Sequence, residues 1–140
     1  MKLSYAEAEN EVLSTPTAAI YQELKDLRAR AGIVPGTDGM YGLTANMTQA
    51  QMRVAIQNER RIEMAFEEQR YFDIRRWKIA GTVMNQPRMG VSIVNTNGSL
   101  TYNYIQVLAT KFNAPTMYLY PIPYDEVLKN PAMKQNPGWN

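Results

Sequence analysis

The chain has 140 residues with fifteen basic and thirteen acidic side chains, which give a formal net charge of +2. This length suits one domain with a substantial core, and so small a charge cannot supply the dense basic surface that nucleic-acid binding requires. The sequence contains no histidine and no cysteine, which excludes imidazole and thiolate metal sites, a Ser-His triad and a cysteine nucleophile. No apolar run has the length of a membrane span or the pattern of a signal segment, so we expect no targeting signal in this chain.

The first 32 residues are predicted to form a pair of helices. Residues 3–13, LSYAEAENEVL, are good helix formers, and Thr15-Pro16 has the pattern of an N-cap followed by proline at the first helical position. Three apolar residues then recur at helical spacing: Ile20, Leu24 and Leu27. Gly32 is expected to close the second helix, and residues 33–47, which are rich in turn residues, are expected to form a loop over the surface.

Residues 48–80 are predicted to form one long helix or two helices. Thr48 and Gln51 have the spacing of a capping box, which marks the start of a helix. A break is expected near Gln69, and Gly81 is expected to end the last helix of this region.

Residues 81–113 are predicted to contain a β-hairpin, because Asn97-Gly98 separates two runs of alternating apolar residues. Tyr102 and Tyr104 fall on one face of the second strand. Alternating strand aromatics usually face a core, so the favoured interpretation is that both rings pack the hairpin onto the helices. The alternative is an exposed platform on which a sugar ring stacks.

Residues 114–140 are predicted to be a docked, extended tail. Four prolines from Met117 onward leave room for at most one helical turn, at residues 125–128. Such a tail can persist only by docking on something. Its expected anchors are large apolar side chains: Tyr118, Tyr120, Ile122 and Trp139.

Residues 58–77 combine five arginines and five carboxylates with large apolar side chains. A helical projection gathers the apolar side chains on one face: Met52, Ala55, Ile56, Ile62, Phe66 and Trp77. Six charged residues lie on this face or beside it: Glu59, Arg60, Glu63, Glu67, Arg70 and Asp73. Because a buried ion is costly unless it is paired, we expect these six to form an internally compensated structural network.

Two other interpretations of this stretch are less economical. Glu59 and Glu63 lie one turn apart and could be the acid and base of a glycosidase, but the adjacent arginines favour the ionised form of both carboxylates. A nucleic-acid surface built from the arginines and aromatic rings is disfavoured because the charges of the stretch cancel. We therefore expect no catalytic residue, no metal site and no cofactor.

Two long motifs stand in the second half of the chain. NERRIEMAFEEQRYFDIRRWK and YLYPIPYDEVLKNPAMKQNPGWN resemble the C-terminal region of the SusD/RagB family of outer-membrane lipoproteins of Bacteroidetes. The first motif matches the family at Glu59, Arg60, Arg61, Glu63, Glu67, Arg70, Asp73, Arg75, Arg76 and Trp77. The second matches at Pro121, Ile122, Pro123, Glu126, Asn130, Pro131, Gln135, Asn136, Pro137 and Gly138. YAEAENEV and LKDLRARAG near the start also resemble family helices, whereas Glu68 stands where the family usually has glycine.

The resemblance implies a tetratricopeptide-like helical fold and a non-catalytic role. Family members bind glycans of the starch or polysaccharide type at the bacterial cell surface and act as a lid on a TonB-dependent transporter of the SusC type. They are held at the outer membrane by a lipid anchor whose cysteine this chain lacks. None of the matched residues is a sugar ligand of the family.

We therefore expect a mostly α fold in a single domain over residues 1–140, with an αα-hairpin, a long helix, a small β-hairpin and an extended Pro-rich tail. Family members are several times longer, so the chain is expected to be a C-terminal segment. In isolation it is expected to expose apolar patches on the first helix pair and to dimerise. The alternative is a free-standing helical module that binds a protein and no sugar.

Overall fold

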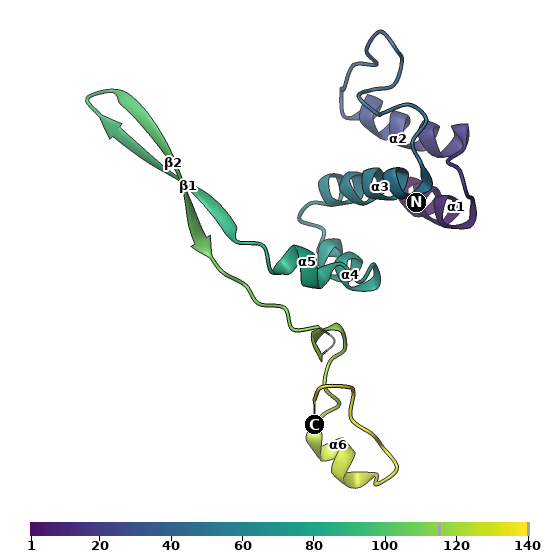
Figure 1. Ribbon diagram of the computed structural model, residues 1–140, viewed down its shortest axis with the longest axis vertical. Coiled ribbons are helices and arrows are strands. Elements are labelled where there is room, and N and C mark those ends of the chain that lie inside the picture. The colour runs from purple at the N-terminus through teal and green to yellow at the C-terminus, as the bar shows by residue number, and fades with distance from the viewer. Residues whose placement is uncertain (115, 140) are drawn as a thin grey trace. The chain divides into compact units, whose positions relative to one another are not determined.

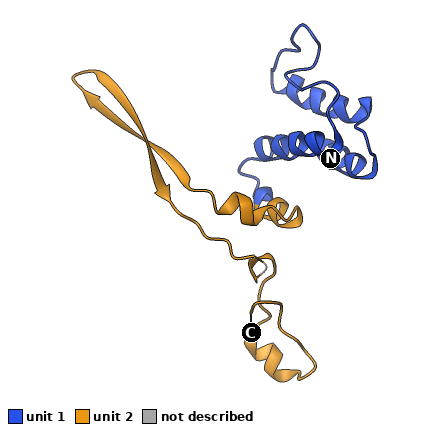
Figure 2. Ribbon diagram, in the orientation of Figure 1, with its two compact units in different colours: residues 1–70 blue, residues 71–140 orange. Residues whose placement is uncertain are grey.

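The computed structural model describes residues 1–114 and 116–139. Within them the chain forms six α-helices, one short 3-10 helix and a two-stranded antiparallel sheet (Figure 1). The prediction of a mostly α fold with a small β-hairpin is thus confirmed. The chain divides into two compact units, residues 1–70 and residues 71–140 (Figure 2). A single domain over residues 1–140 stays a prediction.

Unit 1, residues 1–70, is built on α1 (Lys2–Val12), α2 (Ala18–Arg30) and α3 (Gln49–Glu63). Helix α1 packs against both α2 and α3. One buried apolar cluster joins these elements: Leu3, Ala6, Ile20, Leu24, Leu43, Met47, Met52 and Ile56. The helix pair predicted for the first 32 residues is therefore confirmed.

Helix α2 begins later than predicted. Its N-cap is Thr17 rather than Thr15, and the Thr17 hydroxyl oxygen accepts a hydrogen bond from the Ile20 amide. The same hydroxyl donates to a carboxylate oxygen of Glu9 in α1 at 2.8 Å, which anchors the start of α2 to the neighbouring helix. Gly32 closes α2 as predicted, with a φ of +82° that glycine adopts without a steric penalty.

Residues 33–47 form an ordered crossover between α2 and α3. Leu43 and Met47 are buried in the core of unit 1. The Tyr21 hydroxyl donates to the Thr44 carbonyl at 3.2 Å and accepts from the Met47 amide at 2.8 Å. A side chain of α2 thus satisfies backbone groups of the loop and fixes the point at which α3 starts.

Helix α3 starts at the predicted capping box of Thr48 and Gln51 but ends at Glu63. Phe66 and Glu68 then have positive φ values of +66° and +60°, which no α-helix tolerates. Phe66 is consequently fully exposed, so its predicted place on a continuous apolar face was wrong, as was that of the exposed Ile62. Glu68 occupies the position where the resembling family has glycine, the residue that best accepts this backbone conformation.

Unit 2, residues 71–140, has a smaller core. Helices α4 (Gln69–Arg76) and α5 (Ala80–Met84) are separated by a turn at Lys78, whose φ is +58°. Gly81 therefore lies inside α5 and does not end a helix, contrary to the prediction. The buried side chains of this core come from both helices and from the segment after the hairpin: Ile74, Ala80 and Phe112.

The hairpin consists of β1 (Arg88–Thr96) and β2 (Ser99–Leu108), paired antiparallel around Asn97-Gly98 as predicted. Both turn residues have positive φ, and the Gly98 amide donates to the Asn95 side-chain oxygen at 2.9 Å. Positive φ at both central residues is the requirement that the Asn-Gly pair meets in two-residue hairpin turns.

The tail contains a 3-10 helix, η1 (Thr116–Tyr118), and the short helix α6 (Tyr124–Lys129). In the tail, backbone groups are hydrogen-bonded by side-chain amides instead of by a neighbouring strand. Gln135 accepts from the Ile122 amide at 2.7 Å and donates to the Ile122 carbonyl at 2.8 Å, while the Asn136 side chain donates to the Tyr120 carbonyl. Prolines flank Ile122 on both sides and cannot donate backbone hydrogen bonds. Gln135 and Asn136 of the second motif therefore supply the hydrogen bonds that hold this segment.

Of the four predicted tail anchors, Tyr118 joins the tail to the helices of unit 2, and Trp139 joins two parts of the tail to each other. The Tyr118 hydroxyl donates to the Lys78 carbonyl and accepts from the Gly81 amide, and its ring packs against Phe112. The indole N–H of Trp139 donates to the Thr116 and Leu119 carbonyls at 3.0 Å. Ile122 is half-buried and is held through its backbone. Tyr120 is 71% exposed, so its predicted role as an anchor was wrong.

Candidate functional site

The predicted charge network begins at Glu59, a buried residue of α3. Its partner comes from another helix, because Arg28 of α2 donates from Nε to Glu59 Oε1 at 2.9 Å. The Arg28 guanidinium also donates to the Tyr41 carbonyl at 2.8 Å. One partly buried arginine therefore joins α2, α3 and the crossover loop. One turn further along α3, Glu63 pairs with Arg30 of α2.

The other predicted members of the network have separate surroundings. Arg60 is buried and donates to the Ser4 hydroxyl of α1 at 3.3 Å. Asp73 is buried in α4 and accepts from Arg76 at 2.9 Å. Glu67 is exposed and Arg70 is half-buried. A single network through all six residues stays a prediction, while Glu59, Arg60 and Glu63 are tied to other helices of unit 1.

These contacts bear on the rival catalytic interpretation. Glu59 and Glu63 each accept hydrogen bonds from a guanidinium group, which are charge-assisted contacts that hold two helices together. Glu59 is buried, whereas Glu63 is partly exposed and lies beside a surface hollow. Among the described residues no group of three or more acidic side chains is placed to hold a metal ion.

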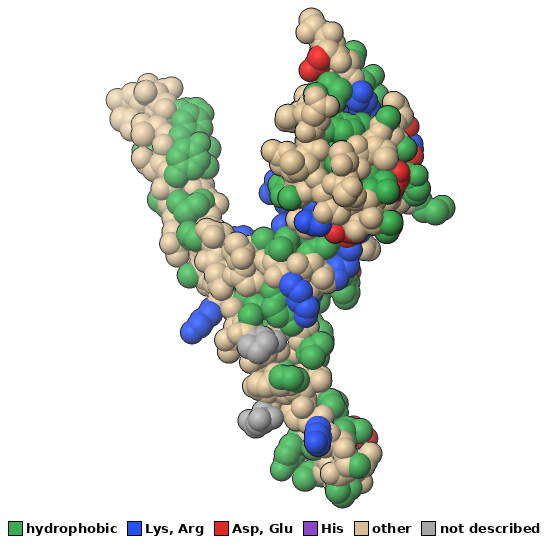
Figure 3. Space-filling model, turned by 45° about the vertical axis from the view of Figure 1, so that its right-hand side comes forward, with side chains coloured by type: hydrophobic (Ala, Val, Ile, Leu, Met, Phe, Trp, Pro, Cys, Tyr) green, Lys and Arg blue, Asp and Glu red, His purple; other side chains and the backbone are tan. Residues whose placement is uncertain are grey.

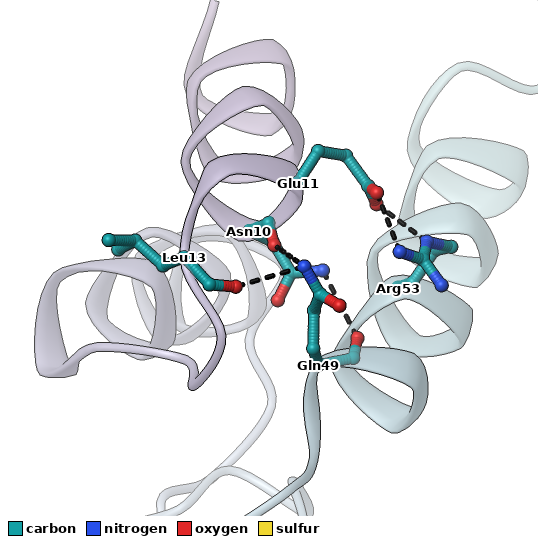
Figure 4. Close-up of polar contacts among 5 residues, drawn as sticks. All are labelled: Asn10, Glu11, Leu13, Gln49 and Arg53. Carbon is teal, nitrogen blue, oxygen red and sulfur yellow. Dashed lines mark hydrogen bonds and ion pairs between the residues drawn. The ribbon is translucent and has the colours of Figure 1, made fainter.

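A polar clasp between α1 and α3 was not predicted (Figure 4). The fully buried Asn10 donates to the Gln49 carbonyl at 3.1 Å, and the Gln49 side chain donates to the Asn10 and Leu13 carbonyls. Beside it, Glu11 and Arg53 form a two-bond ion pair with both distances at 2.6 Å. The Arg53 guanidinium lowers the pKa of Glu11. The sequence signal was an asparagine at i+4 from Ala6, on the apolar side of α1.

The N-terminal end of unit 1 carries a second surface ion-pair group. Lys2 of α1 contacts Asp26 at 2.7 Å and Glu23 at 2.8 Å, both in α2. The hydrogen bond from Lys2 lowers the pKa of Asp26, and the two carboxylates raise the pKa of Lys2.

Two hollows open on the surface of unit 1. The larger, about 560 Å³, lies along α3 and is lined by Thr44, Met47, Ala50, Gln51, Val54, Ala55 and Asn58, none of them charged. The smaller, about 290 Å³, adjoins α1 and the end of α3, with Arg60, Glu63 and Glu67 in its wall. Neither hollow brings an aromatic ring together with polar groups, the combination expected of a sugar site.

The two candidate tyrosines lie in the hairpin of unit 2. Tyr102 is paired with Ile93, and Tyr104 with Val91. Within the described residues Tyr102 is 56% and Tyr104 76% exposed, and neither hydroxyl has a hydrogen-bond partner there. Packing of both rings onto helices and a sugar platform therefore both stay predictions.

None of the helices in residues 1–114 and 116–139 is both long and apolar enough to cross a membrane.

Comparison with known proteins gives a consistent result. The model of the SusD family matches residues 1–139. SusD-like protein P2 of Formosa agariphila is 30% identical over 135 residues, which cover 96% of this chain and 23% of that protein.

Solved structures agree with the sequence comparison. A crystal structure of a SusD-like protein from Bacteroides fragilis NCTC 9343 has a TM-score of 0.78 and 31% identity, covering 99% of this chain and 24% of that one. A SusD homolog from Bacteroides thetaiotaomicron VPI-5482 has a TM-score of 0.68 and 26% identity, covering 99% and 25%. The chain thus spans about a quarter of the length of the relatives it matches.

Proposed function

Because the chain belongs to the SusD family, we propose that the full protein binds glycans of the starch or polysaccharide type at the bacterial cell surface, as part of an outer-membrane nutrient-uptake system. The observation that carries this proposal is the family match over residues 1–139, together with a shared fold at 31% identity. This chain supplies scaffold for that role, since the motif residues Glu59, Arg60 and Glu63 join helices.

The proposed role is non-catalytic. It is supported by the pairing of Glu59 with Arg28 and of Glu63 with Arg30, which commits both carboxylates to holding helices together. Glycosidases use two carboxyl groups that both act on the sugar, whereas each of these glutamates accepts a hydrogen bond from an arginine of α2.

The proposed protein partner is a TonB-dependent transporter of the SusC type, and the proposed location is the outer surface of the outer membrane. Apolar side chains of the tail support a protein contact in this chain. Tyr120, Tyr124 and Leu128 are each more than 60% exposed, although the tail segment that carries them is held in shape by hydrogen bonds from Gln135 and Asn136. The same observation favours the second candidate function, a helical protein-interaction module that binds no sugar.

A glycan array probed with the full-length protein tests the proposal. We expect retention of at least one class of polysaccharide, with no release of reducing ends on prolonged incubation. Retention of no glycan, together with capture of a transporter-type β-barrel protein, would favour the interaction module instead. Release of reducing ends that is lost in Glu63→Gln would contradict the non-catalytic role.

We further propose that the isolated chain dimerises. Tyr5 and Val12 lie seven residues apart on α1, and both are more than half exposed, so they present apolar surface on one side of that helix. Light scattering of the isolated chain is expected to give twice the monomer mass at high concentration. A strict monomer at all concentrations would contradict this expectation.

A further inference from the structure

The hairpin is closed at its base by contacts that do not involve its tip. The Asn85 side chain accepts from the Phe112 amide at 2.6 Å and donates to the Phe112 carbonyl at 3.2 Å. The Thr110 hydroxyl donates to the Met84 carbonyl. Phe112 itself is buried in the core of unit 2. The two ends of the hairpin segment are therefore fixed to each other whatever its strands contact.

One face of the hairpin is defined by its register. Tyr104 is opposite Val91, Tyr102 is opposite Ile93, and Leu100 is opposite Asn95, so these side chains alternate onto the same face. We call this the tyrosine face. Directly opposed side chains on one face lie within contact distance, so the shorter Val91 and Ile93 flank the bases of the two rings. Both tyrosine hydroxyls are free of hydrogen bonds within the described residues.

Beyond its first residue, Arg88, the hairpin carries no formal charge. From Met89 to Thr110 the sequence contains no Asp, Glu, Lys or Arg, although one fifth of the whole chain is charged. In Figure 3 the outer part of the arm formed by the two strands is accordingly green and tan, without blue or red. The nearest charged residues are Arg88 and Lys111, at the base. Such a surface offers nothing that would attract a polyanion.

We propose that the tyrosine face is a binding surface for a neutral glycan chain, an inference that rests on the proposed function and assigns it a site and a substrate class. Tyr102 and Tyr104 would each stack on the apolar face of a sugar ring, since a tyrosine offers a flat apolar body with a polar tip. Their hydroxyls and the side chain of Gln106, which the alternation places on the same face, would hydrogen-bond sugar hydroxyls. Absence of charge fits uncharged sugars better than uronic or sulfated ones.

The test measures affinity of the full-length protein by calorimetry for four probes: maltohexaose, cellohexaose, xylohexaose and polygalacturonate. The variant is the pair Tyr102→Ala and Tyr104→Ala combined. Loss of two stacking contacts is expected to weaken binding of a neutral probe about tenfold. The pair Tyr102→Phe and Tyr104→Phe keeps the rings and should retain most of the affinity. The pair Tyr120→Ala and Tyr124→Ala, equally exposed but in the tail, should retain all of it.

A second pair of variants separates the two faces of the hairpin. Ile93→Lys places a charge beside Tyr102 on the tyrosine face, whereas Val94→Lys places it on the opposite face. Both positions are about half exposed, so both variants should fold, which circular dichroism checks. Binding of the neutral probe is expected to weaken in the first variant and to stay unchanged in the second.

The alternatives give different results. A neutral probe that binds all hairpin variants equally would overturn the tyrosine face as a site while leaving the proposed function intact. Binding of polygalacturonate alone would overturn the neutral class. A change in oligomeric mass in the Tyr→Ala pair, without a change in affinity, would identify the face as a contact between copies and overturn the proposal. Failure of the wild-type protein to bind any probe or any glycan on the array would overturn both proposals.

Discussion

Units 1 and 2 differ in how much of their internal contact is apolar helix packing and how much is hydrogen bonding from side chains to backbone groups. In unit 1 side chains of one helix meet side chains of another, as in the packing of Ile20 and Leu24 and the pairing of Arg28 with Glu59. Unit 1 also has side chains bonded to backbone groups, as at Tyr21 and Gln49, but beside a larger apolar core. In unit 2, whose core is smaller, such bonds join the segments, as from Asn85 to Phe112 and from Gln135 to Ile122. The difference follows from the secondary structure of each unit. Helices satisfy their own backbone and offer side chains for packing, whereas a Pro-rich tail leaves backbone groups that something else must satisfy.

This contrast predicts where the chain is most sensitive to substitution. The largest effect is expected for Arg28→Ala, because it leaves the buried Glu59 carboxylate and the Tyr41 carbonyl without their donor. Breaking a buried ion pair on one side costs about 3–5 kcal/mol. Urea unfolding of the full protein measures the change. Arg30→Ala is the matched control, since Arg30 makes a more exposed pair with Glu63 and should cost about 0.5 kcal/mol. Equal losses in the two variants would contradict the assignment.

The next largest effect is expected in unit 2. Gln135→Ala removes both bonds to the Ile122 backbone, at a cost of about 2 kcal/mol for the stranded groups. The effect should be local, with faster amide exchange at Ile122 and faster proteolysis of the tail while α1 to α3 stay protected. Lys134→Ala, an exposed neighbour, is the control. Global unfolding caused by Gln135→Ala would show that the tail is not a separately stabilised region.

A gain of stability is expected at the boundary between the two regions. Glu68 has a φ of +60°, and a non-glycine residue in this conformation loses about 1 kcal/mol relative to glycine. Glu68→Gly should therefore raise the free energy of unfolding by up to about 1 kcal/mol. Glu67→Gly is the control, because Glu67 is not among the residues with positive φ and should gain nothing. A loss in Glu68→Gly would mean that the glutamate side chain makes a stabilising contact.

The smallest effect concerns pH. Arg53 lowers the pKa of Glu11 in the folded chain, so the stabilisation is present above the unfolded pKa of Glu11 and is lost as the pH falls through the lower, folded value. Because the pair is exposed to solvent, Glu11→Gln should cost only about 0.5 kcal/mol at neutral pH. The difference from wild type should vanish in acid and shrink in high salt. A difference that persists at pH 2 would contradict the ion-pair explanation.

Local signals in the sequence predicted the starts and turns that depend on a few adjacent residues. The capping box at Thr48 and the turn at Asn97-Gly98 are of this kind, because their geometry depends on side chains within three residues. The start of α2 was missed, since Thr15 and Thr17 can both cap and only the contact with Glu9 in α1 distinguishes them. The break near Gln69 was predicted, and α4 begins there, but the end of α3 at Glu63 was not, because every residue from Met64 to Glu68 is compatible with a helix by composition.

The same limit applies to the candidate site. Helical periodicity identified Glu59 and Glu63 as charges on the packed side of their helix, but it cannot say which helix packs there. Their partners, Arg28 and Arg30, lie about thirty residues earlier in the chain and were not predicted. Register alternation likewise placed Tyr102 and Tyr104 on one face. The alternation cannot show what covers that face, because covering residues need not be near the hairpin in the sequence.

The two hydrogen bonds between the Asn85 side chain and the Phe112 backbone affect how the hairpin can evolve. A segment whose two ends are already joined can be lengthened, shortened or exchanged at little cost, since closing a longer loop adds only about 0.6 kcal/mol for each doubling of its length. We therefore expect the two strands to tolerate replacement by other sequences, while Asn85 and Phe112 do not. Exchange of the hairpin segment alone would then change the ligand preference without substitutions in the helices that hold it.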